Sequence, residues 1–127
     1  MSEEIKHKII IVDDDDFLLD MYATKFSNSG VLVVPCKSGQ AMLESLKTET
    51  GVKAILLDIV MPELNGIETL EEMRKQKLGE GIPVIMLTNQ NEEDDIKRAE
   101  ELGVNGYIVK SSATPSEVVE QVMKYIN

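Results

Sequence analysis

Four apolar stretches of this sequence each lead into polar residues that could do chemistry. Asp13 to Asp16 follow the first stretch, and Asp58, Thr88 and Lys110 stand at the ends of the other three. Carboxylates held close together repel one another unless they are protonated or share a cation, and an all-oxygen site suits Mg²⁺. Beside such an ion a carboxylate can act as the nucleophile that forms an acyl phosphate, while a hydroxyl and an ammonium bind the phosphoryl oxygens. The residue types therefore favour phosphoryl transfer, provided that the chain brings the four places together.

Two hydrophobic periodicities indicate the elements that would position these residues. Apolar, β-branched runs occupy residues 8–12, 31–35, 54–58, 83–87 and 106–110, and each is followed by a segment with one apolar stripe at helical spacing. The runs alternate little, which is typical of strands buried on both faces. The pattern predicts a doubly wound α/β fold, (βα)5, with a five-stranded parallel sheet and helices on both faces. In such a sheet ligands bind beyond the carboxyl ends of the strands, so the four polar places are expected to meet there.

Capping residues mark where several helices should begin and end. Thr114 with Glu117, and Asn65 with Glu68, have the spacing of a capping box, and Asn91 precedes a run of acids suited to a helix N-terminus. Glycines suited to the left-handed position after a helix are Gly30, Gly51, Gly79 and Gly103. The basic run "RKQK", residues 74–77, is interpreted as cations at a helix C-terminus and nothing more.

Composition excludes several classes of function. The 127 residues, 43% of them hydrophobic, suit a single domain over 1–127, and a net charge of −10 argues against a nucleic-acid partner. Cys36 is the single cysteine and is interpreted as a small buried hydrophobe, and His7 as a surface residue, so no zinc site is expected. No apolar run approaches the roughly 20 residues of a membrane span, and the polar N-terminus does not resemble a signal peptide. The expected location is therefore cytoplasmic, without a membrane partner.

Four motifs in this order resemble the receiver domain of response regulators over about residues 6–126. They are "IIIVDDD" (9–15), "LLDIVMPELNG" (56–66), "VIMLT" (84–88) and "GYIVK" (106–110), and the pattern D-x-x-M-P-x-x-x-G is the most specific of them. The resemblance implies the flavodoxin-like strand order 2-1-3-4-5. It also implies a phosphorylation-activated switch, which takes its phosphoryl group from a sensor histidine kinase or a phosphotransfer protein and is an enzyme only toward its own phosphorylation and dephosphorylation.

The resemblance assigns a role to each matching residue. Asp58 matches the phosphoacceptor, Thr88 the hydroxyl that moves toward the phosphoryl group, and Lys110 the lysine that pairs with it. Asp13, Asp14, Asp58 and the backbone carbonyl of Val60 match the Mg²⁺ site, with Asp14 and Asp58 as direct ligands. Tyr107 matches an aromatic switch that swings inward when the threonine moves. The output partner would bind the face formed by the fourth helix, fifth strand and fifth helix, and phosphorylation could also produce a homodimer.

Three positions depart from the family pattern or leave it open. Asn89 stands where the family usually has a small residue, which bears on phosphoryl access and lifetime. Ser111 stands where proline is common, which bears on the placement of Lys110. In the run of four aspartates, Asp15 and Asp16 are interpreted as loop or N-cap residues of the first helix.

Other functions remain to be weighed against this one. Asp58 alone could be a solvated strand end, and the aspartate run alone could be a helix cap. Asp13-x-Asp15 resembles the motif of haloacid-dehalogenase-like phosphatases, but Phe17 stands where those enzymes have Thr or Val, and the chain leaves little room for their extra elements. A receiver-like binding module that works without phosphorylation is a third reading. A calcium loop is excluded because its sixth and twelfth positions would be Leu18 and Thr24 instead of Gly and Glu.

Overall fold

A single parallel sheet organises the chain. The computed structural model describes residues 7–89 and 93–126. The strands are β1 (His7–Val12), β2 (Val31–Cys36), β3 (Val52–Asp58), β4 (Val84–Thr88) and β5 (Gly106–Val109). The helices are α1 (Asp16–Ser27), α2 (Gly39–Thr48), α3 (Gly66–Lys75), α4 (Glu93–Glu101) and α5 (Pro115–Ile126), with a 3-10 turn at Lys110–Ser112. All neighbouring strands are parallel in the order β2-β1-β3-β4-β5, so the predicted fold and strand order are confirmed.

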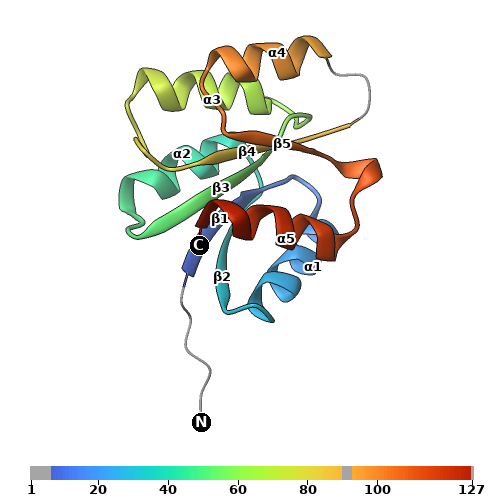
Figure 1. Ribbon diagram of the computed structural model, residues 1–127. Coiled ribbons are helices and arrows are strands. Elements are labelled where there is room, and N and C mark those ends of the chain that lie inside the picture. The colour runs from blue at the N-terminus through green and yellow to red at the C-terminus, as the bar shows by residue number, and fades with distance from the viewer. Residues whose placement is uncertain (1–6, 90–92, 127) are drawn as a thin grey trace.

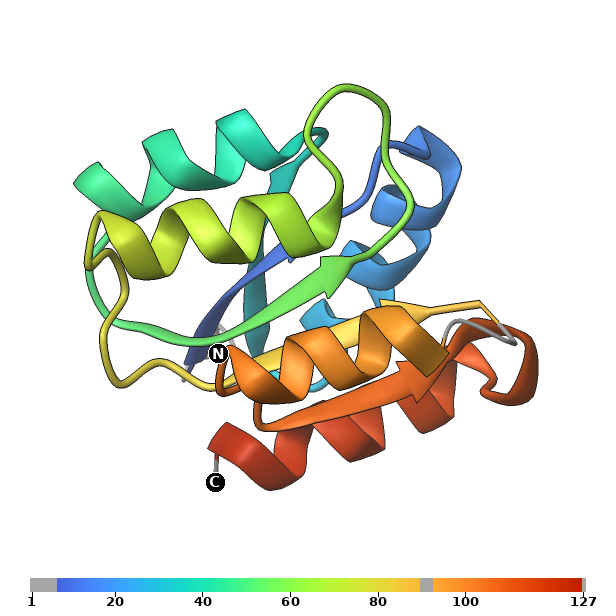
Figure 2. The same ribbon diagram turned by 90° about the horizontal axis from the view of Figure 1, so that it is seen from above.

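Helices cover both faces of this sheet (Figures 1 and 2). On one face, Ile9, Ile11 and Leu56 pack with α1 and α5, whereas on the other face Ile10 and Leu57 pack with α2, α3 and α4. Successive residues of a strand point to opposite faces, so a continuous apolar run supplies both cores. This double burial fixes each strand along its length and therefore fixes the residues at its carboxyl end.

The predicted strand boundaries were right to within about two residues at either end. Thr88 is the last residue of β4, as the sequence indicated. Lys110 leaves β5 and opens the 3-10 turn. The interpretation of His7 as a surface residue was wrong: it is the half-buried first residue of β1 and pairs with Val31, and its Nδ1 has no hydrogen-bond partner among the described residues.

The predicted helix starts at Asn65 and Thr114 are confirmed, whereas α3 ends at Lys75, four residues before the predicted Gly79. Both capping boxes are present, with reciprocal bonds between Asn65 and Glu68 and between Thr114 and Glu117. Gly30, Gly51 and Gly103 follow helices with positive φ angles, as predicted. After α3 the left-handed residue next to the C-cap Gln76 is Lys77 (φ 56), and the predicted Gly79 (φ 60) lies two residues further on. Cys36 is buried, as predicted. Asn91, the predicted cap of the fourth helix, lies outside the described residues. Among the residues described, no helix has the length and apolar character needed to span a bilayer.

Candidate functional site

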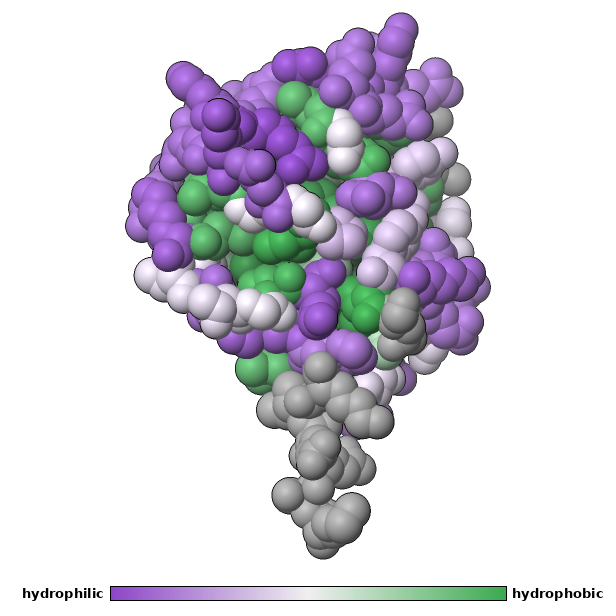
Figure 3. Space-filling model, turned by 60° about the vertical axis from the view of Figure 1, so that its left-hand side comes forward, coloured by the Kyte–Doolittle hydropathy of each residue, from purple (hydrophilic) through white to green (hydrophobic). Residues whose placement is uncertain are grey.

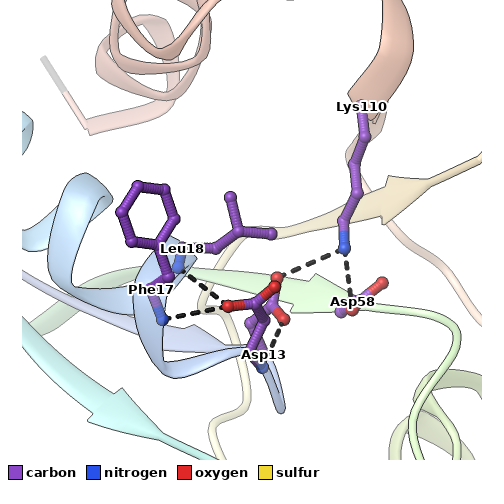
Figure 4. A network of polar contacts seen from close by, with 6 residues as sticks. Asp13, Phe17, Leu18, Asp58 and Lys110 are labelled. Atoms are coloured by element: carbon purple, nitrogen blue, oxygen red, sulfur yellow. Dashed lines mark hydrogen bonds and ion pairs between the residues drawn. The ribbon is translucent and has the colours of Figure 1, made fainter.

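Acidic side chains and one lysine converge at the carboxyl edge of the sheet (Figure 4). Asp13 follows β1, Asp58 ends β3, and Lys110 follows β5. The Lys110 ammonium lies 2.9 Å from Asp58 Oδ2 and 3.2 Å from Asp13 Oδ2, so it bridges carboxylates from two strands. One carboxylate oxygen from each of Asp13, Asp14 and Asp58 lies within 4.8 Å of the others. The parallel topology thus brings together residues that are up to 97 positions apart in the chain.

The run of aspartates divides into two parts with different tasks. Asp13 is 1% exposed, and its Oδ1 accepts a hydrogen bond from the Asp15 backbone N–H at 2.9 Å. Asp15 caps α1, because its Oδ1 accepts from the N–H groups of Phe17 and Leu18. The interpretation of Asp15 as the N-cap is therefore confirmed, while Asp13 and Asp14 remain directed to the site.

The loop after β3 is tight, and Gly66 is the residue that allows it. The Gly66 N–H donates to the carbonyl of Ile59 at 2.8 Å, and a Cβ on Gly66 would collide with the backbone carbonyl of Asp58. The Ile59 N–H in turn donates to Leu87 O on β4 at 3.0 Å. This loop holds the backbone of Asp58 in place, and the backbone N–H of Val60 acts to lower the pKa of the Asp58 carboxyl. The glycine of the D-x-x-M-P-x-x-x-G pattern is thus required by a close backbone approach.

Burial dominates the electrostatics of the Asp58 carboxyl. Desolvation raises its pKa from 3.8 to about 6, against the opposing effect of the hydrogen bond and charge of Lys110. Burial also acts to lower the Lys110 pKa, but the hydrogen bond and charge of Asp58, together with Asp13, outweigh it and raise that pKa above its ordinary value. Lys110 is therefore held as a cation. Burial disfavours the ionised form of Asp58, and the Lys110 ammonium only partly offsets this effect. A second cation nearby would therefore stabilise the Asp58 carboxylate further.

The other predicted residues lie around this centre in different ways. Thr88 is 1% exposed, and its hydroxyl donates to the Asn89 carbonyl at 3.0 Å. The Val60 side chain is exposed. Tyr107 is 48% exposed on β5, so its ring is not packed into the core in this structure. Ser111 lies within the 3-10 turn, and Lys110 reaches both carboxylates without a proline there. The roles assigned to Val60, Thr88 and Tyr107 stay predictions, as do those of Asp13, Asp14, Asp58 and Lys110.

Tyr22 is a neighbour of the site that the sequence did not reveal. It belongs to the apolar stripe of α1 and is 5% exposed. Burial raises the pKa of its phenol, and the charges of Lys110, Asp13 and Asp58 act on it as well. The apolar stripe that placed Tyr22 in the core carried no signal for this proximity, which depends on how α1 packs against the sheet.

Comparison with known proteins agrees with this geometry. Residues 9–123 match the response regulator receiver domain family. The chain belongs to that family. The response regulator SaeR of Staphylococcus aureus is 36% identical to this receiver domain over 114 residues, which are 90% of the chain and 48% of SaeR. The chain thus spans about half the length of the curated relatives it matches.

Solved structures show the same fold. A CheY-like receiver domain protein from Methanospirillum hungatei superposes with a TM-score of 0.84 at 29% identity, covering 95% of this receiver domain and 94% of that chain. The receiver domain of the Francisella response regulator 1452 gives a TM-score of 0.82 at 27% identity, covering 95% and 97%. The predicted family and the CheY-like flavodoxin fold are therefore confirmed.

Proposed function

We propose that this receiver domain is a phosphorylation-activated switch that accepts a phosphoryl group on Asp58, in a Mg²⁺-dependent reaction, from a sensor histidine kinase or a phosphotransfer protein. The observation that carries the proposal is the bridge from Lys110 to Asp13 and Asp58. It unites a buried nucleophile, a second carboxylate and a fixed cation in one crevice. Family membership supports the same reading.

The residues fit the reaction in chemical terms. Asp58 Oδ attacks the phosphorus of a phosphohistidine, the P–N bond breaks, and its electron pair returns to the imidazole as an acyl phosphate forms on Asp58. Asp13, Asp14, Asp58 and the Val60 carbonyl would hold Mg²⁺, since an all-oxygen set with three carboxylates in close reach suits that ion. When bound, the ion neutralises charge on the phosphoryl oxygens. Lys110 adds a second positive charge beside the nucleophile and keeps it oriented.

The signal would arise from residues at the ends of β4 and β5. Thr88 exchanges its hydrogen bond with Asn89 for one to a phosphoryl oxygen, and Tyr107, which is exposed now, turns inward. The output partner would then bind the α4–β5–α5 face, or a second copy of the chain would. In this proposal the chain is one cytoplasmic domain that catalyses only its own phosphorylation and dephosphorylation.

Incubation with Mg²⁺ and acetyl phosphate, followed by intact-mass measurement, tests the proposal. We expect a gain of one phosphoryl group that is lost in Asp58→Ala, and no gain when EDTA is present. A receiver-like module that works without phosphorylation would show no mass change in the unaltered chain. Steady turnover of a phosphate ester that Asp13→Asn abolishes and Asp58→Asn does not would instead indicate the phosphatase chemistry.

A further inference from the structure

Two acidic helices, α3 and α4, lie side by side on one face of the sheet (Figures 1 and 2). The acidic residues of α3 are Glu68, Glu71 and Glu72, and those of α4 are Glu93, Asp94, Asp95, Glu100 and Glu101. Hydrophilic residues dominate the upper part of the molecule in Figure 3, where these helices lie. Ala99 is the single fully buried residue of α4. Like charges on the two helices repel, and α4 buries little apolar surface. Other contacts must therefore hold α4 against α3.

Both arginines of the chain supply such contacts. One reaches from α4 to α3, and the other reaches from α3 to the residues that follow α4. Arg98 of α4 donates from Nε and Nη2 to Glu71 Oε2 of α3, at 3.2 and 2.9 Å. Arg74 of α3 donates from Nε to the carbonyl of Leu102 at 2.8 Å and from Nη2 to the carbonyl of Gly103 at 3.3 Å. The sequence contains no other arginine. Several donors on a planar, permanently charged group suit arginine to these forked contacts better than lysine.

The contact of Arg74 corrects the interpretation of the basic run at residues 74–77. Arg74 does lie in the last turn of α3, as expected for a cation near that dipole. Its guanidinium, however, binds the carbonyls of Leu102 and Gly103, which directly follow α4 and lie 28 and 29 positions away in the chain. A cation from α3 thus bonds carbonyls just beyond the C-terminus of α4 and stabilises that end of the helix. The run therefore carries a tertiary contact that helix-dipole reasoning alone does not suggest.

We infer that Arg74 and Arg98 form a latch that holds α4 on α3 while Asp58 is unphosphorylated, and that the latch opposes phosphoryl binding at the site. The inference rests on the proposed function. The link between the two regions is the hydrogen bond from the Thr88 hydroxyl to the Asn89 carbonyl, at the point where the chain leaves β4 toward α4. A phosphoryl oxygen on Asp58 would compete for that hydroxyl proton, which would free the carbonyl at the start of the connection.

Thermodynamic linkage makes this coupling measurable. If movement of the Thr88 hydroxyl to the phosphoryl group displaces α4, the latch contacts stabilise the unphosphorylated state more than the phosphorylated state. Weakening the latch then tightens binding of a phosphoryl mimic, and binding of the mimic loosens the latch by the same factor.

Affinity for a beryllofluoride phosphoryl mimic in the presence of Mg²⁺ is the test. Arg98→Gln and Arg74→Gln are each expected to raise that affinity about two- to fivefold, the range set by a partly exposed ion pair or capping contact. Glu71→Gln keeps both arginines and should raise the affinity as much as Arg98→Gln does. The double variant Arg98→Gln/Glu71→Gln should bind the mimic no more tightly than either single variant. Arg98→Lys should fall between the unaltered chain and Arg98→Gln.

The control is Lys8→Gln, which removes an ion pair of similar length between β1 and the residue after α2 (3.0 Å to Glu49) and should leave the affinity unchanged. Circular dichroism checks that each variant is folded. If the unaltered chain binds no beryllofluoride with Mg²⁺, the proposed function itself fails. If it binds and the arginine variants bind with equal or lower affinity, the latch is overturned while the proposed function stands.

Discussion

Helices α4 and α5 follow neighbouring strands whose ends both contribute to the site, yet they are attached to the sheet in different ways. Helix α5 buries Val118, Val119, Val122 and Ile126 in the core it shares with α1. Helix α4 buries only Ala99 and is held to α3 by guanidinium contacts. Apolar burial stabilises by about 25 cal/mol per Å², whereas exposed ion pairs contribute about 0 to 1 kcal/mol. The comparison teaches that α5 belongs to the rigid body of the domain and that α4 is the helix best suited to move.

The largest expected difference is in hydrogen exchange. Amides of α4 should exchange at least about a hundredfold faster than those of α5, because opening α4 exposes little apolar surface whereas opening α5 exposes the core. Exchange measured at low denaturant concentrations distinguishes the two routes. Rates in α5 should rise with denaturant, as global unfolding does, and rates in α4 should not. Equal protection and equal denaturant dependence in both helices would contradict the comparison.

Truncation of one buried side chain in α5 should come next in size. Val122→Ala is expected to lower the free energy of unfolding by about 2 to 3 kcal/mol, through lost burial and the cavity left behind. Ile96→Ala, at a partly buried position of α4, should cost less than about 1 kcal/mol, since the removed atoms were partly in water. Urea denaturation measures both. A larger loss for Ile96→Ala would mean that α4 is anchored as firmly as α5.

The protonation state of Asp58 changes the free energy of unfolding of the whole domain, and it does so without a substitution in α4 or α5. Burial raises its pKa to about 6, so the folded chain binds a proton more readily than the unfolded chain, and metal-free stability falls as pH rises from about 4 to 6. Asp58→Asn cannot ionise and should raise the free energy of unfolding by about 1 to 2 kcal/mol at pH 7, with no gain near pH 4. This gain should slow exchange in α5 and leave α4 unchanged.

The control for that experiment is Asp20→Asn, an exposed carboxylate on α1. It should change stability little at either pH. A gain from Asp58→Asn that is the same at pH 4 and pH 7 would show that ionisation of Asp58 is not its source.

The smallest effect should come from the N-terminus of α5. Thr114 Oγ1 accepts from the Glu117 N–H at 3.2 Å. Glu117 Oε1 accepts from the Thr114 N–H at 2.9 Å, and this bond is the largest cause that lowers the pKa of the Glu117 carboxyl. Thr114→Ala is expected to lower stability by about 1 kcal/mol, as for other lost caps. Thermal denaturation beside the exposed Thr50→Ala variant would measure it. If the two variants lose equal stability, the cap adds nothing to the attachment of α5.

Most of the fold and the centre of the site could be predicted from the sequence. Capping boxes, such as those at Asn65 and Thr114, and buried strands depend on residues close together in the chain. The spacing of residue types therefore predicts them. The meeting of Asp13, Asp58 and Lys110 followed from parallel topology alone, because strand direction decides which ends share an edge. The interpretation of His7 failed because β1 begins one residue before the apolar run, and pairing with β2 extends the strand there.

By itself the sequence determined which residues are strand, helix and cap, and which carboxylates and cations stand at strand ends. Only the tertiary structure decided that Gly66 lies against the Asp58 carbonyl, that the charges of the site act on Tyr22, and that both arginines join α3 to the C-terminal part of α4 and the residues after it. The physical reason is range. Hydrophobic periodicity and capping act within a few residues along the chain, whereas the partner of a long charged side chain is set by the packing of two helices that are distant in sequence.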